Sequence, residues 1–247
     1  IWKGLVGSEM CIRDSNEDPM YILAGLPFIA PDYSSAWLLK DVQMEYLQEK
    51  FDKKGLMILY TAPWPGQGFY TKFPVNSVSD FSGKKLRIYS TATQQMGSML
   101  GFNATILPFA EIPQAFSTGL IEALFTSPQT GIDIQAWDNT KHFTYAGAIF
   151  SKNAVVVTKK AFNALSKGDQ SNMLAAAKKA ELRGWEMSAE TTKKQIDILK
   201  KNGMSSKNAP DEVISKMKSI GLEMMKNWRS KASPEANAVL DRYLSMR

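Results

Sequence analysis

The chain has 247 residues, of which 44% are hydrophobic and 22% charged, and its formal net charge is +6. This composition is typical of a globular protein that buries one large core or two smaller ones. A single cysteine, Cys11, excludes an internal disulfide, and a single histidine, His142, excludes a histidine-rich metal site. Phosphate-loop, dinucleotide-binding and nucleophile-elbow motifs are absent from the sequence, which argues against an enzyme.

The positive charge comes largely from lysine pairs in the last ninety residues. The pairs, such as Lys178–Lys179 and Lys193–Lys194, alternate with acidic residues along helical patterns. This arrangement is typical of solvated helix faces. A nucleic-acid binder is the alternative that net charge alone would favour, but we expect no nucleic-acid partner.

The first eighteen residues, IWKGLVGSEMCIRDSNED, have neither a strand nor a helix period. They also lack the architecture of a secretory signal peptide. The stretch VGSEMCIRDS resembles a translated sequencing-adaptor string. We therefore expect residues 1–18 to be a non-native or disordered leader.

The next segment alternates short apolar runs with turns. Residues 21–26 predict a strand, and Ser34 or Ser35 can cap a helix that continues to about Lys50. LMILY, residues 56–60, predicts a buried strand of the kind found in parallel sheets. The stretch TAPWPGQGFYTKFPV, residues 61–75, predicts a loop that exposes Trp64, Phe69 and Tyr70.

An alternation of strands and helices follows. Strands are predicted at KKLRIY, ATILPF, LIEALF, FTYAGAIF and AVVVT, and helices at TATQQMGSMLG and EIPQAFSTG. Strands separated by helices of about ten residues indicate a mainly parallel sheet. In KKLRIY, Lys85, Arg87 and Tyr89 share one face, and Arg87 lies near the carboxyl end of the strand. Ligands of open α/β sheets bind outside those ends.

The last ninety residues predict long helices. Ser166 and Asp169 resemble a capping box that starts a helix ending near Asn202. One buried face of this helix is predicted from the spacing of Trp185, Ala189, Thr192, Ile196 and Leu199. A second helix begins after Asp211, with a stripe at Val213, Met217, Ile220, Met224 and Trp228, and a third begins at Ser233–Pro234.

Four segments together resemble the DctP-like solute-binding proteins of tripartite ATP-independent periplasmic (TRAP) transporters. They are GLPF, FPVNSVSDFSGKKLRIYS, PFAEIPQAFSTGLIEA and NALSKGDQSNMLAAAKKA. The resemblance implies a two-lobed periplasmic-binding-protein α/β fold with crossing strands and a long helix that spans both lobes. It also implies that roughly sixty to eighty residues of the first lobe are missing at the amino terminus.

This resemblance gives a division of the chain. Residues 19–72 would be the remnant of lobe I, and residues 73–153 would be lobe II. Residues 154–200 would return to lobe I with the spanning helix, and residues 201–247 would be carboxyl-terminal helices packing on the lobes.

The resemblance also implies a binding site. Arg87 occupies the position whose guanidinium forms a salt bridge with the solute's carboxylate, a geometry that suits its planar fork. The other implied contacts are Ser90, Thr91, Phe109, Phe125, Thr126 and Asn153. The loop after LIEAL carries no carboxylate, so we expect no metal ion and no cofactor. Lys72 could partly replace a second arginine of sugar-acid members, but Phe73 argues against such a ligand. Phe73, Phe109, Phe125 and the loop from Trp64 to Tyr70 favour an apolar or aromatic carboxylate.

The expected function is therefore an organic-acid receptor. It would capture a carboxylate between its lobes in the periplasm, as a monomer without enzymatic activity, and deliver it to TRAP permease subunits in the membrane. The alternative is a ligand-sensing module of the same fold in a signalling system.

Overall fold

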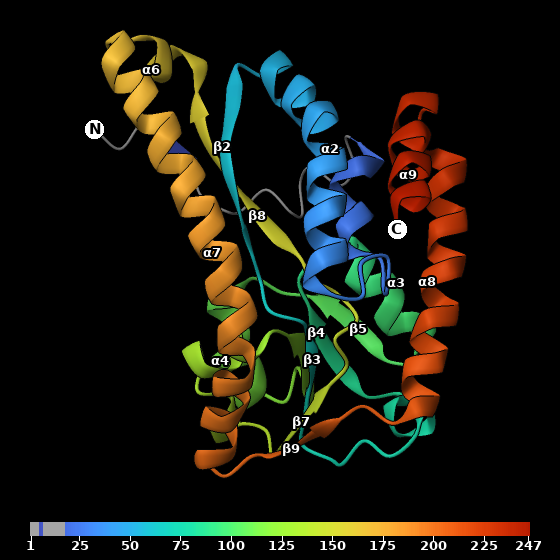
Figure 1. Cartoon of the computed structure of the whole chain (residues 1–247). Helices are drawn as coiled ribbons and strands as arrows, with labels where there is room; N and C mark the ends of the chain where they lie inside the picture. Colours follow the sequence, from blue (N-terminus) through green and yellow to red (C-terminus); the bar gives the residue numbers. More distant parts are fainter. Residues whose placement is uncertain (1–4, 7–17) are drawn as a thin grey trace.

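The computed structural model describes residues 5–6 and 18–247. Cys11 and most of the predicted leader, residues 1–18, lie outside the described residues. Two sheets organise the described part of the chain, and they lie one above the other in Figure 1.

The smaller sheet contains three strands in the described part of the chain. Its central strand β8 (Lys152–Thr158) pairs antiparallel with β2 (Leu56–Pro63) on one side and with the short β1 (Leu5–Val6) on the other. The helix α2 (Tyr33–Lys53) packs on β2. The short helix α6 (Lys159–Asn163) follows β8 directly.

The larger sheet has six strands within the described residues and is mixed. Their order is β5 (Asn103–Ile106), β4 (Lys85–Ile88), β6 (Ala123–Thr126), β3 (Gly68–Thr71), β7 (His142–Tyr145) and β9 (Ser205–Asn208). β4 is parallel to β5 and β6, whereas β3 is antiparallel to both β6 and β7. Its connecting helices are η4 (Val78–Phe81), α3 (Thr91–Met99), η5 (Phe109–Glu111), α4 (Ile112–Ser117), α5 (Pro128–Asp133) and η6 (Ala136–Asp138).

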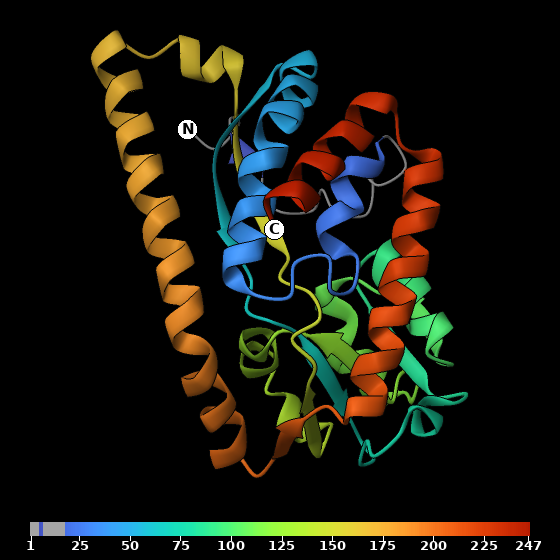
Figure 2. The same cartoon turned by 45° about the vertical axis from the view of Figure 1, so that its right-hand side comes forward.

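Two extended segments and one helix join the sheets. We call residues 64–67, between β2 and β3, the first crossing segment, and residues 146–151, between β7 and β8, the second. The helix α7 (Lys167–Lys201) runs beside both sheets, along the left edge in Figures 1 and 2, and contacts both β2 and α5. Strands that cross between two sheets and a helix that spans them confirm the predicted two-lobed class of fold.

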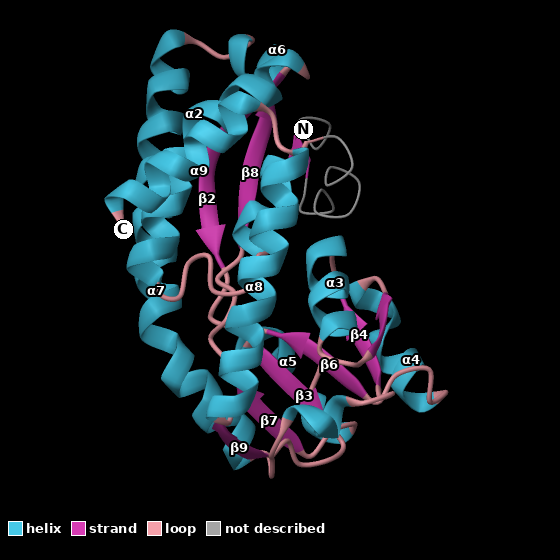
Figure 3. Ribbon diagram, turned by 90° about the vertical axis from the view of Figure 1, so that its right-hand side faces the viewer, coloured by secondary structure: helices cyan, strands magenta, loops and turns pink. Residues whose placement is uncertain are grey.

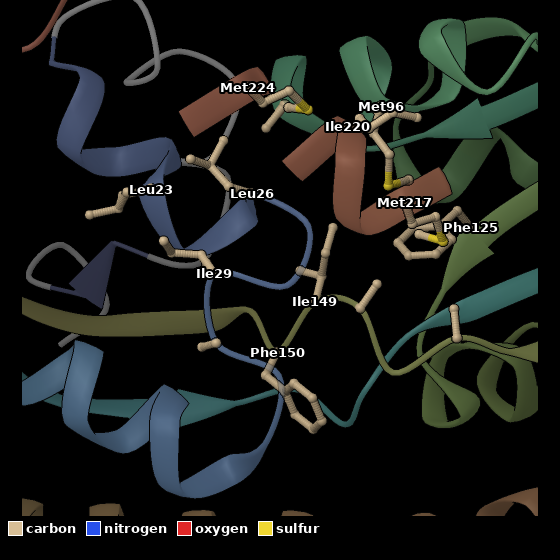
Figure 4. Packing of buried hydrophobic residues seen from close by; sticks show 14 of the residues in the cluster. Leu23, Leu26, Ile29, Met96, Phe125, Ile149, Phe150, Met217, Ile220 and Met224 are labelled. Carbon is tan, nitrogen blue, oxygen red and sulfur yellow. The ribbon is translucent and has the colours of Figure 1, made fainter. Parts of the chain in front are cut away.

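The main hydrophobic core joins the larger sheet to α2 and the second crossing segment, whereas Ile58 of β2 and Val156 of β8 belong to a separate small cluster. Figure 4 shows Ile149 and Phe150 of the second crossing segment near Leu26 and Ile29, which follow the 3₁₀ helix η3 (Pro19–Gly25). Met217, Ile220 and Met224 of α8 (Asp211–Lys231) close this core from one side. The last helix, α9 (Pro234–Met246), packs on α2, and Figure 3 shows that α8 extends from the upper to the lower sheet.

Several predictions in the first half of the chain are wrong. Asp32, rather than Ser34 or Ser35, caps α2, and β2 pairs antiparallel with β8 instead of lying in a parallel sheet.

Two further segments also differ from their predicted structure. Residues 21–26 do not form a strand, because Pro19 starts a 3₁₀ helix whose first turn is capped by the Asp18 carboxylate. Phe69 and Tyr70 are not in an exposed loop: they form β3 at the centre of the larger sheet and are fully buried. The aromatic and β-branched residues of β3 suit a strand, whereas the glycines and prolines before it had indicated a loop.

The predicted long helices are confirmed, with one difference. Ser166 caps α7, and the apolar stripe of α8 is buried as predicted. On α7, Ala189 is exposed, while Ser188 and Gln195 are buried. Their hydrogen bonds explain this difference: Tyr33 bonds to Ser188, and Gln195 donates to Gln129 of α5. The buried face of α7 is therefore partly polar.

Candidate ligand-binding site

The carboxyl ends of five strands, β4, β5, β6, β7 and β9, lie at one edge of the larger sheet. This follows from the pairing, since β3 is antiparallel to both β6 and β7, and β9 is parallel to β7. The same edge carries the start of β3, where the first crossing segment enters, and the end of β7, where the second leaves. It therefore faces the smaller sheet, in the position where α/β proteins hold ligands.

Arg87 lies near this edge and is almost completely buried, with 4% of its surface exposed. Its Nε donates a hydrogen bond of 3.0 Å to the Leu107 carbonyl oxygen, which fixes the direction of the side chain. None of the ion pairs among the described residues includes Arg87. The planar guanidinium thus retains hydrogen-bond donors that a carboxylate can accept bidentately.

Burial lowers the pKa of Arg87 to about 10, and the neighbouring Tyr89 only partly opposes this effect. Taking a cation out of water destabilises its charged form unless an anion lies beside it. A strongly perturbed pKa in a group at a cleft is typical of a functional site. The electrostatics therefore favour an anionic ligand at Arg87.

Tyr89 connects the arginine strand to both crossing segments. Its hydroxyl donates to Gln67 Oε1 at 2.7 Å, and Gln67 Nε2 donates to Ser151 Oγ at 3.0 Å. The backbone carbonyl of Gln67 also accepts bonds from Ala146 and Gly147 of the second crossing segment. Gln67 thus links this edge of the larger sheet to the second crossing segment. The two lobes would move about the crossing segments.

Ser90 and Thr91, both predicted contacts, stand at the start of α3. Ser90 is the N-cap: its Oγ accepts the Thr93 amide, and its own amide donates to Thr93 Oγ1. These two hydrogen bonds use the Ser90 hydroxyl oxygen and backbone amide, which are the groups with which Ser90 would contact a bound anion. Thr91 is half-buried in the first turn.

Thr126 and Phe125 end β6 but lie on opposite faces of the sheet. Phe125 is fully buried against Phe69 in the main core, with ring centroids 4.9 Å apart. Thr126 is opposite Gly68 of β3, on the face that also carries Arg87, because Arg87 pairs with Leu124 two residues before Thr126. The structure thus brings Thr126, rather than Phe125, to the arginine's face.

The remaining predicted residues are dispersed. Phe109 is 53% exposed in η5, just after the Leu107 carbonyl that holds Arg87. Asn153 is the second residue of β8 and pairs with Ala62 across the crossing region. Lys72 follows β3 at the edge opposite Arg87, and it contacts Phe116 rather than the arginine. Lys72 therefore cannot replace a second ligand-binding arginine beside Arg87.

A hollow of about 380 Å³ lies between the start of α2 and the middle of α7. It is lined by Tyr33, Ser34, Trp37 and Trp185, with the two indole rings packed edge to face. Tyr33 also packs on Phe150 of the second crossing segment at 4.9 Å between centroids. These aromatic side chains form a wall on the side of the smaller sheet, and sequence reasoning had treated Trp185 as core alone.

Within residues 5–6 and 18–247, the structure contains no cluster of three or more metal-binding side chains. In the same part of the chain, no helix is both long and apolar enough to cross a membrane.

The sequence profile of the DctP family, described as bacterial extracellular solute-binding protein, family 7, matches residues 13–231. The chain belongs to this family. Membership confirms the resemblance seen in the sequence, and it places the chain in a family of binding proteins rather than enzymes.

Two solved structures resemble the DctP-family chain over almost its whole length. DctP7 of Bordetella pertussis, an extracytoplasmic solute receptor binding pyroglutamic acid, is 36% identical with a TM-score of 0.91, over 96% of this chain and 77% of that one. A marine-metagenome TRAP solute-binding protein specific for pyroglutamate is 31% identical with a TM-score of 0.90, over 96% and 78%.

The curated relatives are more distant. A solute-binding protein of Chromohalobacter salexigens is 24% identical over 187 residues, which are 72% of this chain and 55% of that protein. The chain therefore spans little more than half the length of the curated relatives it matches.

Proposed function

We propose that the chain is part of an extracytoplasmic TRAP solute receptor that binds a small carboxylate, with pyroglutamate as the first candidate. Arg87 carries this proposal: a buried guanidinium without a carboxylate partner among the described residues lies at the ligand edge of the sheet. The two similar receptors at 36% and 31% identity bind pyroglutamate, which has one carboxylate and a small ring.

The side chains around Arg87 support a small polar acid better than an aromatic one. Phe69 and Phe125 belong to the core on the other face, and Phe73 follows Lys72 at the opposite edge. The groups on the arginine's own face include Tyr89, Thr126 and Tyr145, all of which carry hydroxyls. Most of the aromatic side chains on which the predicted preference for an apolar or aromatic acid was based therefore lie away from Arg87.

The binding step is a closure of the two lobes. The ligand would bind Arg87 on one lobe while the aromatic wall of the other lobe moves over it, and the crossing segments act as the hinge. The ligand shifts the open–closed equilibrium by its differential affinity for the closed state. The receptor would then present the closed form to membrane permease subunits outside the cytoplasm.

Calorimetric titration with L-pyroglutamate and a panel of other organic acids tests the proposal. We expect binding in the parent chain and at least about a 30-fold loss in Arg87→Ala, since truncating one partner of a buried charge pair costs about 2 kcal/mol or more. Arg183→Ala is the matched control, because Arg183 is exposed on α7 and pairs only with the exposed Glu186. Equal affinities in the parent and Arg87→Ala would contradict the proposal.

A further inference from the structure

Tyr145 is the last residue of β7, and its side chain lies on the same face of the larger sheet as Arg87. The pairing shows this directly: Arg87 is opposite Leu124, Leu124 is opposite Tyr70, and Tyr70 is opposite Phe143. Tyr145 is two residues beyond Phe143, so it belongs to the same face and is one step closer to the crossing segments. Neither composition nor sequence motifs had identified it.

Two glycines allow Tyr145 to approach the crossing region. A β-carbon on Gly66 would lie 2.4 Å from the Tyr145 hydroxyl oxygen, and one on Gly68 would lie 2.9 Å from the Tyr145 Cα. A larger residue at Gly66 would displace the tyrosine hydroxyl, whereas one at Gly68 would first meet the Thr144 carbonyl oxygen, 2.4 Å from the added β-carbon. The hydroxyl group therefore lies directly against the first crossing segment.

The Tyr145 hydroxyl forms no hydrogen bond with any described residue. Its surroundings are largely apolar on this side, with Phe150 beside the same glycine. Burial raises the pKa of Tyr145 to about 12, and Tyr33 of the aromatic wall adds to this shift. A half-buried phenol usually has a hydrogen-bond partner, so a bound ligand is a candidate for the partner that the described residues do not supply.

We infer that Tyr145 is a specificity residue whose hydroxyl hydrogen-bonds the second polar group of the bound carboxylate, the ring amide in a pyroglutamate-like ligand. The inference rests on the proposed function, because it places the ligand's carboxylate on Arg87. A phenol both donates and accepts, so it can bond either the carbonyl or the N–H of a ring amide.

The strand order sets the separation of the two residues. β4 and β7 are three strand spacings apart, roughly 14 Å. A ligand that contacts both side chains therefore needs polar groups at two separate positions, as the carboxylate and the ring amide of pyroglutamate are.

The test compares two ligands with the same ring size. L-Pyroglutamate has a carboxylate and a ring amide, whereas cyclopentanecarboxylate has the carboxylate alone. Both are titrated calorimetrically, the weaker one by displacement, into the parent chain, Tyr145→Phe and the control Tyr60→Phe. Tyr60 is a half-buried tyrosine of β2 in the smaller sheet.

We expect Tyr145→Phe to weaken pyroglutamate binding roughly tenfold, as expected for the loss of one hydrogen bond. Its affinity for cyclopentanecarboxylate and both affinities of Tyr60→Phe should stay unchanged. An unchanged ratio of the two affinities in Tyr145→Phe overturns the inference, whether both affinities fall together or neither falls.

Gly66→Ala gives a second route to the same answer if Tyr145→Phe does not fold. Its new methyl group displaces the Tyr145 hydroxyl, so the ratio of affinities should fall there too. If the ratio stays at its parent value in this variant, the inference is likewise overturned. Failure of the parent chain to bind either acid overturns the proposed function itself, and the role of Tyr145 falls with it.

Discussion

Arg87 shows how one side chain can make a site recognisable. A buried cation is expensive unless it is paired, and among the described residues its only hydrogen bond is the neutral one to Leu107. A carboxylate that accepts two parallel hydrogen bonds from the guanidinium would compensate the cost of removing this cation from water. The same geometry that destabilises an unliganded chain would therefore give the proposed carboxylate ligand its affinity.

Asp18 is a buried charge of the opposite kind, because it is fully paired. Its carboxylate accepts hydrogen bonds from the Met20 amide and the Tyr46 hydroxyl and forms a 2.8 Å ion pair with Lys50. Burial alone would raise the pKa of Asp18, but the bonds from Lys50, Met20 and Tyr46 outweigh it and hold this pKa below its usual value. Its stabilising effect is therefore present above the unfolded pKa and is lost as the pH falls through the folded pKa.

We predict that Asp18→Asn lowers the free energy of unfolding by about 2 kcal/mol at pH 7, since charge-assisted bonds are lost. The difference from the parent should begin to shrink as the pH falls below about 4, where Asp18 of the unfolded chain becomes protonated, and it should vanish once the pH falls through the lower pKa of the folded state. Urea denaturation at a series of pH values measures this.

Asp32→Asn is the control, because Asp32 caps α2 and asparagine caps a helix about equally well. It should cost less than Asp18→Asn at pH 7, because asparagine keeps the cap and the bond from the Ser35 amide is the main cause that lowers the pKa of Asp32. A constant penalty for Asp18→Asn from pH 7 to the acid range would show that charge is not the cause.

At the residue scale, the sequence predicts the position of Arg87 in its strand, whereas the ligand role of Arg87 and its neighbours stays a prediction. Strand alternation predicts that Arg87 and Tyr89 share one face, and the Arg87 guanidinium carbon lies 6.0 Å from the centre of the Tyr89 ring. Assigning Phe125 to that face required the register of β6 against β4, which local sequence does not determine. The sequence analysis missed Tyr145 because its position depends on contacts with Gly66 and Gly68. These glycines are distant in sequence, and no side-chain pattern indicates that they contact Tyr145.

Two glycines in long helices differ in the space available for a side chain. Gly184 in α7 has open space where a β-carbon would lie. Gly221 in α8 packs so closely that a β-carbon would lie 2.1 Å from the Pro27 carbonyl oxygen. Pro27 precedes Phe28, whose amide donates to Ala148 of the second crossing segment. The absence of a side chain at Gly221 therefore lets α8 pack on the loop that contacts the hinge.

We predict opposite effects of the same substitution at the two positions. Gly184→Ala should raise the free energy of unfolding by up to about 1 kcal/mol, because alanine favours the helix. Gly221→Ala should lower it by roughly 2 kcal/mol, because relieving the backbone contact outweighs helix propensity. Thermal or chemical denaturation of both variants measures the signs, and stabilisation by Gly221→Ala would contradict the packing argument.

At the element scale, the predictions succeeded where local signals decide. Ser166 and Ser233 cap α7 and α9 as predicted, since N-cap chemistry acts within a few residues. The predictions failed where distant contacts decide. Ser188 and Gln195 are buried on α7 because Tyr33 and Gln129 approach them from other elements, and no pattern along the helix indicates this.

At the scale of the whole molecule, the two sheets depend on shared contacts. One hydrophobic core extends from η3 and α8 through the second crossing segment to the larger sheet. The order of sheets and crossings followed from family resemblance, because strand alternation alone does not determine which strands change sheet. The division into lobes at residues 72, 153 and 200 remains a proposal.

Gln67 joins the two crossing segments to the edge of the larger sheet near Arg87. Its side chain links Tyr89, two residues after Arg87, to Ser151 of the second crossing segment, and only 2% of its surface is exposed. Gln43 offers a matched comparison, since it is also buried but bonds Lys152 and Met20 within the smaller sheet's lobe.

We predict that Gln67→Leu lowers both the free energy of unfolding, by about 1–3 kcal/mol, and the affinity for the carboxylate ligand. The stability falls because two partly buried hydroxyl groups lose their partner, and the affinity falls because Arg87 is no longer held in register with the hinge. Gln43→Leu should lower the stability by a similar amount and leave the affinity unchanged. Urea denaturation and calorimetric titration separate the two quantities. If Gln67→Leu destabilises the chain but binds the ligand as the parent does, the hydrogen bonds of Gln67 stabilise the fold without positioning the site.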